Sequence, residues 1–424
     1  MISFVDKFFL RSNNLGKISQ NIKSLTNNTP ANKIFKAINS YSSDSEIRYV
    51  GGCIRKIMSE QKVDDIDLAT NLKPQEVCDA LKKNNLSYYE TGLEHGTITT
   101  IVDNYKFEIT SLREDVYTDG RHAKVKFSSD WKKDASRRDF TINSIYADKD
   151  GNLFDPYGGK KDLEKGLIKF IGNPDDRIKE DYLRILRYLR FFINYSKNPH
   201  SPEIIKTLKV NISGVSKISR DRLLDELKKI INLDSLEKLS KDQLSLSLIF
   251  AIFPELKNLS IFSNLKSENK EILKEKDFIF LLSLMLVDKN DNIDYFLYKY
   301  NISKKDQKRL KIINNFYKDK INKNSFLENN INKIFYYFGN QAVDDILVFG
   351  IIKYKRFSET LISLRNIFKY RTIPIMPISA TELMNKYNIS EGVQLGAKLK
   401  LIEEKWLENQ FKISDQQIND IIKN

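Results

Sequence analysis

Two aspartates, Asp65 and Asp67, stand one residue apart in the segment VDDIDLAT, residues 63–70. If this segment is a strand, its side chains alternate between two faces, so both carboxylates point to one side while Ile66 points into the core. Mg²⁺ takes one or two protein carboxylates and completes its shell with water and phosphate oxygens. The pair therefore predicts a magnesium site, with an acidic surface turn as the alternative.

A pair of glycines lies shortly before the aspartates, in RYVGGCIRK, residues 48–56. Gly51 and Gly52 would let a ligand approach the backbone, and Arg55 would project from the first turn of a following helix, whose N-terminus favours anions. Neither G-x-x-x-x-G-K-[ST] nor G-x-G-x-x-G occurs in the chain, so other phosphate-binding motifs are not supported. A double glycine also occurs in simple tight turns, but beside paired carboxylates it favours a site for a metal ion and a triphosphate.

A third stretch, EDYLRILRYLRFFI, residues 180–193, carries charged residues at every third position. These are Asp181, Arg184, Arg187 and Arg190. On one helix such a row drifts by about 60° per step, and the intervening residues form an apolar stripe. Arginines on so apolar a helix need anionic partners. The stretch therefore predicts a helix that presents guanidinium groups to an anion, or one that forms internal Asp–Arg pairs.

The composition favours a polyanionic partner and a reducing compartment. A net charge of +14 and a pI of about 9.3 suit nucleic acid, although a lysine-rich solvated surface gives the same balance. Cys53 and Cys78 are too few for a disulfide framework. The N-terminal segment is interrupted by charges well short of a signal-peptide core or a membrane span. We expect a cytoplasmic protein with no membrane contact and no obligate protein partner, and an organellar presequence stays open.

The elements that must position these residues change in character near residue 172. Ten of the sixteen glycines lie between residues 51 and 172, where β-prone runs such as GTITTIV and KFEITSL alternate with helical patterns such as PQEVCDALKKN. Beyond this region, DRLLDELKKIINL and AKLKLIEEKWLENQF carry apolar residues at helical spacing. The sequence predicts an α+β fold, in which a head with a small mixed sheet precedes an all-helical remainder.

Several motifs in order resemble the class II tRNA nucleotidyltransferase and poly(A) polymerase family. They are GGCIRK with DIDLATN, GLEHGTITTIV, SRRDFTINSIYAD, FDPYGGKKDLEKGLIKFIG and RIKEDYLRILRYLRFF, within residues 48–195. The stretch PISATELMNKYNISEGVQLGAKLKLIEEKW resembles the C-terminal region of these enzymes more weakly. The resemblance implies a polymerase-beta-like nucleotidyltransferase head followed by a helical neck, body and tail. It also implies Mg²⁺-dependent addition of CCA to tRNA 3′ ends from CTP and ATP, without a nucleic-acid template.

Four parts of the chain are expected on this basis. They are an N-terminal helical extension (residues 1–30), the catalytic head (31–172), a neck with the nucleotide-selecting helix and an RNA-binding region (173–255), and a body and tail that bind tRNA (256–424). No Gly/Ser-rich or Pro-rich linker marks these boundaries in the sequence.

The family pattern implies a role for each candidate residue. Asp65 and Asp67 would be the catalytic residues and would hold the metals that bridge the triphosphate and activate the tRNA 3′-hydroxyl. Gly52 and Arg55 would meet the phosphates of the incoming nucleotide. Arg138, in the RRDF segment, would contact the nucleotide as well.

The resemblance also makes EDYLRILRYLR an amino-acid template for the incoming base. C and A both present an exocyclic amino donor beside an unprotonated ring nitrogen, so Asp181 would accept from the first and Arg184 would donate to the second. U and G reverse this pattern and would be rejected. Arg187 and Arg190 would lie beside the triphosphate or structure the pocket.

Four further residues have supporting or alternative roles. Asp139 and Asn143 are expected to shape the nucleotide site. Arg137 either contacts the substrate or is a solvated charge beside the motif. Glu108, in KFEIT, either supplies a third carboxylate or faces solvent.

Short segments bear on which reaction of the family is performed. GLEHGT, which contains His95, resembles the CCA-adding version of its motif, whereas poly(A) polymerases of the family usually carry R-F-x-L-x-H-V; His95 itself is expected to be structural. The polar loop over residues 113–127 is expected to be mobile and to take part in the switch from C to A addition. Lys56 replaces the Asp that commonly ends the family's G-G-x-V-R-D pattern, and this puts the contacts around Arg55 in doubt.

Three functions remain open at this stage. The first is CCA addition to tRNA. The second, in the same chemistry, is poly(A) synthesis or the addition of only CC or only A. The third is a catalytically silent RNA-binding protein, which would need neither the Asp65–Asp67 pair nor the Asp181–Arg184 pair.

Overall fold

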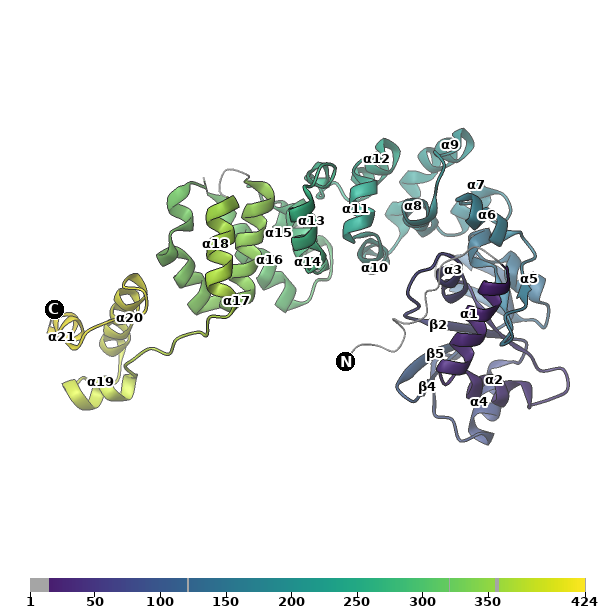
Figure 1. Ribbon diagram of the computed structural model, residues 1–424, viewed down its shortest axis with the longest axis horizontal. Coiled ribbons are helices and arrows are strands. Elements are labelled where there is room, and N and C mark those ends of the chain that lie inside the picture. Colours follow the sequence, from purple (N-terminus) through teal and green to yellow (C-terminus); the bar gives the residue numbers. More distant parts are fainter. Residues whose placement is uncertain (1–14, 120–121, 320, 355–357, 424) are drawn as a thin grey trace. The chain divides into compact units, whose positions relative to one another are not determined.

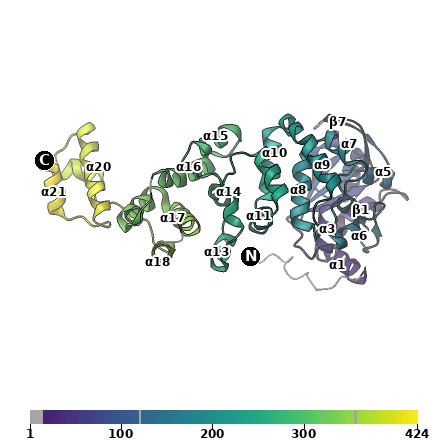
Figure 2. The ribbon, with the colours of Figure 1, turned by 90° about the horizontal axis from the view of Figure 1, so that it is seen from above.

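The computed structural model describes residues 15–119, 122–319, 321–354 and 358–423. These residues fall into two compact units that divide between Leu227 and Lys228. All strands of the described chain lie in the first unit, and the second contains helices without strands (Figures 1 and 2). The predicted α+β fold is confirmed. The four-part division of the chain stays a prediction.

The first unit is built on a seven-stranded mixed sheet with the order β3-β4-β5-β2-β1-β8-β9. Its strands are β1 (Ile47–Val50), β2 (Ile66–Thr70), β3 (Tyr88–Gly92), β4 (Thr97–Val102), β5 (Tyr105–Ser111), β8 (Tyr146–Ala147) and β9 (Leu153–Phe154). Strands β2 and β5 pair in parallel, and the other neighbours are antiparallel. A separate hairpin is formed by β6 (Arg113–Asp119) and β7 (His122–Phe127). The runs GTITTIV and KFEITSL are strands, as predicted.

Helices cover both faces of the central strands. On one face lie α1 (Leu15–Asn28), α2 (Ala31–Asn39), α3 (Gly52–Met58) and α4 (Pro74–Lys83), whose apolar side chains share one core with the strands (Figure 1). On the other face, α5 (Trp131–Ser136) contributes Ala135 and Trp131 to a smaller core with Val50, Ala69 and Tyr146. The strands β1 and β2 are thus packed on both faces. The two glycines follow the end of β1, and the two aspartates lie at the start of β2.

Short helices complete the first unit. The 3-10 helix η3 (Thr141–Asn143) precedes β8, and after β9 come α6 (Gly159–Lys165), α7 (Pro174–Glu180), α8 (Leu183–Tyr195), α9 (Pro202–Asn211) and η4 (Ile212–Lys217). The next helix, α10 (Arg220–Ile230), crosses the boundary between the units. Asn173 caps α7 by accepting the backbone N–H groups of Asp175 and Asp176, and Pro174 opens the helix, as this position favours.

The prediction of one continuous helix over residues 180–193 is wrong. Helix α7 ends at Glu180, Asp181 has extended backbone with φ −154° and ψ 104°, and α8 begins at Leu183. The Asp181 side chain accepts the backbone N–H of Leu183 at 3.2 Å, a local bond that competes with helix continuation. Arg184, Arg187 and Arg190 therefore share a helix with one another, and Asp181 lies outside it.

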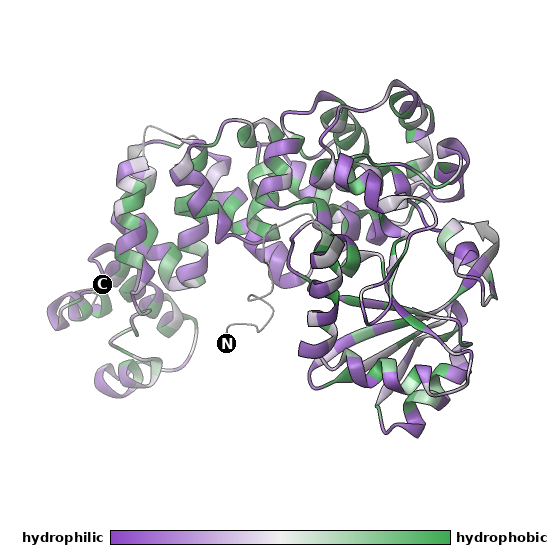
Figure 3. Ribbon diagram, turned by 45° about the vertical axis from the view of Figure 1, so that its right-hand side comes forward, coloured by the Kyte–Doolittle hydropathy of each residue, from purple (hydrophilic) through white to green (hydrophobic). Residues whose placement is uncertain are grey.

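The described residues of the second unit form helices and their connections, without strands. Its helices are α11 (Leu233–Leu239), α12 (Gln243–Ile252), η5 (Leu259–Phe262), α13 (Ser267–Lys274), α14 (Phe278–Leu286), α15 (Asn292–Lys299), α16 (Lys304–Lys318), η6 (Lys323–Phe326), α17 (Glu328–Lys353), α18 (Ser358–Lys369), α19 (Ala380–Tyr387), α20 (Val393–Glu408) and α21 (Asp415–Lys423). Figure 3 shows that hydrophobic and hydrophilic residues alternate along the helices. The last three share a small core of their own that includes Leu383, Ile402 and Ile418. Among the described residues, no helix is long and apolar enough to cross a membrane.

Candidate active site

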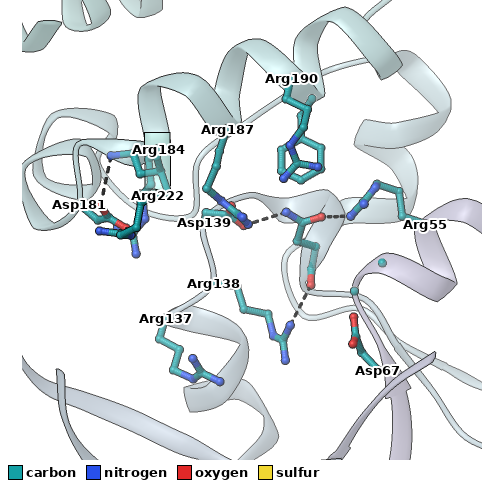
Figure 4. Close-up of a pocket in the computed structure, with 15 residues that line it drawn as sticks. Arg55, Asp67, Arg137, Arg138, Asp139, Asp181, Arg184, Arg187, Arg190 and Arg222 are labelled. Atoms are coloured by element: carbon teal, nitrogen blue, oxygen red, sulfur yellow. Dashed lines mark hydrogen bonds and ion pairs between the residues drawn. The ribbon is translucent and has the colours of Figure 1, made fainter. Parts of the chain in front are cut away.

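A cavity of about 440 Å³ in the first unit is lined by most of the predicted site residues (Figure 4). Those that line it are Gly52, Arg55, Asp67, Arg138, Asp181, Arg184, Arg187 and Arg190. Asp65 is not among the lining residues. The lining includes seven arginines and only three aspartates, so the cavity suits an anion with several negative charges.

Bare backbone borders the carboxylate end of this cavity. Gly51 has φ +65°, a conformation that glycine adopts without strain, and it immediately precedes α3. A Cβ atom on Gly52 would lie 3.5 Å from Asp67 Oδ2, and one on Gly51 would lie 3.4 Å from Arg138 Nη1. The two glycines therefore keep the space between Asp67 and Arg138 free of side chains.

The predicted metal ligands lie at the start of β2. Asp67 is half-buried on the strand, and Asp65 is exposed immediately before it. Glu108 is the register partner of Asp67 on the parallel strand β5, and its carboxylate pairs with Lys106 at 2.6 Å. Burial raises the pKa of Asp67, the nearby carboxylates of Glu108 and Asp65 raise it further, and the guanidinium groups of Arg138 and Arg55 offset part of this effect. A bound cation would stabilise this carboxylate in its charged form.

The donor set fits a hard divalent ion held by two carboxylates. Within the described ranges, no group of three or more His, Cys, Asp or Glu side chains is placed to hold a metal. A closed three- or four-ligand site of the zinc type is therefore not formed there. Mg²⁺ binds through one or two carboxylates and keeps the remaining positions for water and substrate oxygens, so Asp65 and Asp67 fit its requirements.

Arg55 is buried, only 7% exposed, and it lines the cavity. Its Nη1 donates to Asn143 Oδ1, and its guanidinium lies 4.7 Å from the ring centroid of Phe191 and 5.2 Å from that of Tyr195. Its Nε has no hydrogen-bond partner among the described residues. The other six arginines of the cavity each pair with a carboxylate, whereas no described carboxylate pairs with Arg55. Its charge is thus available to an anionic ligand.

Lys56, which stands where the family pattern commonly has Asp, lies outside the cavity. Lys56 Nζ pairs with Asp64 Oδ2 at 3.0 Å, close to the surface, and Lys56 does not line the cavity. A lysine at this position supplies no carboxylate to Arg55, and the effect of this departure from the family pattern stays a prediction.

A buried aspartate that the sequence analysis missed holds both arginines of the RRDF segment. Asp134, from α5, pairs with Arg137 at 2.8 Å and with Arg138 at 3.1 Å, and it accepts the Tyr146 hydroxyl at 2.6 Å. Burial raises the pKa of Asp134, but the two guanidinium groups outweigh this effect and hold it well below its ordinary value. The signal for this role was the spacing of an aspartate three and four residues before paired arginines.

Asp139 anchors the middle of the cavity. Its Oδ2 accepts from Arg187 Nε at 2.7 Å and Nη2 at 2.6 Å, and its Oδ1 accepts from Asn143 Nδ2 at 2.8 Å. Burial raises the pKa of Asp139, whereas Arg187 and Asn143 lower it, with a net value of about 2. Asn143 in turn accepts from Arg55, so Asp139 and Asn143 link Arg187 to Arg55. That these two residues shape the nucleotide site stays a prediction.

We expect the first unit to lose stability as the pH falls from about 4 towards 2. An unfolded Asp139 would titrate near its ordinary pKa of about 3.9, but in the fold the pKa is about 2. The stabilisation is therefore complete above pH 4 and is lost as the pH falls through 2, and it amounts to about 3 kcal/mol. Urea unfolding of the wild type and of Asp139→Asn at several pH values would measure it. An equally steep pH dependence in the variant would contradict this assignment.

At the end of the cavity that holds Asp181 and Arg184, the alternative of an internal Asp–Arg pair is not observed. Asp181 and Arg184 do not form an ion pair with each other. Arg184 Nη1 donates to Glu180 Oε2 at 2.6 Å, and Asp181 Oδ2 accepts from Arg222 Nη2 at 2.6 Å. Figure 4 shows Asp181, Arg184 and Arg222 together at one end of the cavity, with Asp67 and Arg55 at the other. Glu180 and Arg222 were not singled out in the sequence.

Phe191 brings three guanidinium groups together beside the cavity. The distances from its ring centroid are 4.3 Å to Arg190, 4.7 Å to Arg55 and 5.6 Å to Arg187. Arg190 is held in addition by Glu226, a buried carboxylate on α10. The ring thus supports a cluster of positive charge. A phenylalanine inside an apolar stripe gave no sign of this role in the sequence.

The remaining predicted elements lie away from the cavity. His95 ends the short helix η2 (Leu93–His95), is exposed, and does not line the cavity; its carbonyl accepts from Arg113 Nη1. In the loop expected to switch from C to A addition, residues 120–121 and the side chains of residues 115–124 lie outside the described part of the structure.

Paired carboxylates at a strand end, bare glycine backbone and an arginine-lined cavity together define a nucleotidyltransferase head. Comparison with known proteins agrees, since the Poly A polymerase head domain family matches residues 47–169. The mouse protein named CCA tRNA nucleotidyltransferase 1, mitochondrial, is 32% identical over 383 residues, which cover 89% of this chain and 86% of that protein. The chain belongs to the CCA tRNA nucleotidyltransferase family, and the resemblance predicted from its motifs is confirmed.

Solved structures with similar folds support the architecture of the whole chain. The CCA-adding enzyme of Bacillus stearothermophilus in complex with CTP matches with a TM-score of 0.67 and 18% identity, over 93% of this chain and 96% of that one. The Thermotoga maritima CCA-adding enzyme complexed with tRNA matches with a TM-score of 0.63 and 18% identity, over 96% and 98% of the two chains. The predicted order of a sheet-containing head followed by helical parts is the order of this fold.

Proposed function

We propose that this protein adds CCA to the 3′ end of tRNA, with CTP and ATP as substrates and without a nucleic-acid template. The relative in mouse is named for this activity, and similar folds have been solved with CTP and with tRNA. The observation that carries the proposal is a single cavity with the Asp67 carboxylate and the unpaired Arg55 at one end and Asp181 with Arg184 at the other. Such a cavity offers separate groups for the triphosphate and for the base.

Members of this family depend on a divalent metal ion. We infer that the ion is Mg²⁺ and that Asp65 and Asp67 hold it, because they offer hard oxygen donors and the pKa of Asp67 is raised in the absence of a metal ion. When bound, such an ion would supply the positive charge that activates the tRNA 3′-hydroxyl and stabilises the departing pyrophosphate.

The chain's own residues would bind and orient the nucleotide. Arg55 would donate to triphosphate oxygens from a position that is already desolvated, and the bare backbone at Gly52 would leave room for the phosphates beside Asp67. Asp181 and Arg184 would read the amino group and ring nitrogen shared by C and A. In the reaction the terminal tRNA 3′-oxygen forms a bond to the α-phosphorus, and the bond from that phosphorus to pyrophosphate breaks.

We place this activity in the cytoplasm, on the basis of two buried cysteines that are free thiols. The mouse relative carries a mitochondrial name, so a mitochondrial location is the alternative. Localisation of the tagged chain, with the tag at the C-terminus, distinguishes the two.

Extension of three tRNA transcripts, ending before CCA, after C and after CC, would test the proposed activity. Purified protein with Mg²⁺ would receive each labelled nucleotide separately and all four together, and the 3′ ends would be resolved to one nucleotide. The proposal expects two additions from CTP, one from ATP, then arrest, with no use of UTP or GTP. Long tails from ATP alone would indicate a poly(A) polymerase, addition of only CC or only A would indicate a partial enzyme, and tRNA binding without extension would indicate a silent RNA-binding protein.

A further inference from the structure

Asp181 is held by an arginine from a helix outside the segment that carries the base-selecting residues. Arg222 lies on α10, 41 residues further along the chain, and its Nη2 donates to Asp181 Oδ2 at 2.6 Å. The side chains are 26% and 19% exposed, and both residues line the same cavity (Figure 4). This charge-assisted bond is partly shielded from water, which makes it stronger than a surface ion pair.

The pairing leaves Asp181 able to accept from a base. Oδ2 accepts from Arg222, and Oδ1 accepts from the backbone N–H of Leu183 at 3.2 Å. Each carboxylate oxygen has two lone pairs, so both retain capacity for a further donor. Arg222 therefore fixes the direction of the Asp181 carboxylate and leaves a lone pair on each oxygen to accept a hydrogen bond from a base.

A second contact fixes the backbone beside Asp181. The ring of Tyr182 packs so closely on Gly214, in η4, that a Cβ atom on Gly214 would lie 2.0 Å from Tyr182 Cε1. Asp181 itself has the extended backbone of the break between α7 and α8. Both anchors, Gly214 and Arg222, come from the stretch that follows α8, so this stretch sets where the carboxylate lies.

We propose that Arg222 is a positioning residue for base selection and that it acts through Asp181; this rests on the proposed function. Arg222 keeps the Asp181 carboxylate apart from Arg184, which pairs with Glu180 instead. Without Arg222, the carboxylate loses its fixed direction, and Arg184, three residues along the chain, is a cation that lines the same cavity. An Asp181–Arg184 pair would occupy the two groups that read the base. Loss of a fixed acceptor also removes the repulsion that a carbonyl group of U or G would meet.

Steady-state addition of single nucleotides to the tRNA transcripts, with each of the four nucleotides, would test this role. In Arg222→Ala, we expect kcat/KM for CTP and ATP to fall about tenfold or more, mainly through KM, as the loss of a charge-assisted bond predicts. The preference for CTP over UTP should fall by a similar factor. Arg220→Ala is the matched control, because Arg220 is exposed on the same helix and does not line the cavity; its preference for CTP should equal that of the wild type.

A double-mutant cycle separates this role from general destabilisation. If Arg222 acts through Asp181, then Asp181→Ala with Arg222→Ala should discriminate no worse than Asp181→Ala alone. An equal loss of kcat for all four nucleotides in Arg222→Ala, or additive losses in the double variant, would overturn the inference. If Arg222→Ala does not fold, Arg222→Lys decides: it keeps the charge but not the planar fork, so a several-fold loss of preference supports the inference and an unchanged preference overturns it.

The inference and the proposed function fail in different ways. A wild-type protein that does not extend tRNA would contradict the proposed function itself. A wild-type protein that adds C and A selectively, together with an Arg222→Ala variant of equal selectivity, would contradict only the role of Arg222.

Discussion

Replacement of Asp67 by asparagine is expected to lower the rate of nucleotide addition by roughly 1000-fold. The substitution keeps the size of the side chain and removes one of the two charges that we assign to the metal site. Asp67 lines the cavity, and burial and nearby carboxylates raise its pKa, so a bound metal ion would stabilise its negative charge. Single-turnover addition of CTP to tRNA at saturating Mg²⁺ measures the effect, and Asp65→Asn is expected to act similarly.

Glu108→Gln is the matched control for the metal site. Glu108 is the register partner of Asp67 on β5, but its carboxylate is paired with Lys106 at 2.6 Å. We expect a loss of less than about tenfold, because this ion pair is largely exposed. A loss as large as that of Asp67→Asn would make Glu108 a third carboxylate of the site. Full activity in Asp67→Asn, with tRNA binding unchanged, would remove Asp67 from the catalytic role.

Replacement of Arg55 by alanine is expected to raise KM for CTP and ATP by roughly 10- to 100-fold. This range corresponds to hydrogen bonds from a charged group of about 1.5–3 kcal/mol. The free energy of unfolding is expected to change by less than about 1 kcal/mol, because the variant removes a buried charge that no described carboxylate pairs. Nucleotide titrations and urea unfolding of the same protein samples measure the two quantities.

Arg138→Ala provides the comparison for Arg55. Arg138 lines the same cavity, but unlike Arg55 it pairs with a carboxylate, that of the buried Asp134, at 3.1 Å. Its Nε also donates to the Tyr146 hydroxyl at 3.0 Å. Its removal is expected to weaken both nucleotide binding and stability, because Asp134 loses a partner. If Arg55→Ala destabilised the fold as much as Arg138→Ala while KM stayed constant, Arg55 would be a structural residue.

Local patterns in the sequence predicted the nucleotidyltransferase head and much of its site. The sequence placed Asp67 on a strand and the glycines at residues 51 and 52 before a helix, and the fold keeps them together because β1 and β2 are paired. Asp65 precedes β2, so strand alternation does not apply to it. The motifs, taken together in their order, were specific enough to predict the family. The comparison with the mouse relative confirms this prediction. The roles of the individual site residues stay predictions.

Only the tertiary structure decided how the charges pair. The sequence suggested that Asp181 and Arg184 share one helix, but the chain breaks at Asp181, and each residue takes a different partner. Spacing along the chain predicts contacts within a helix or strand, where geometry repeats. An ion pair between Asp181 and Arg222 depends on which helices pack together, and a free charge such as that of Arg55 depends on the absence of a partner in three dimensions. Local periodicity contains neither kind of information, so both required the folded chain.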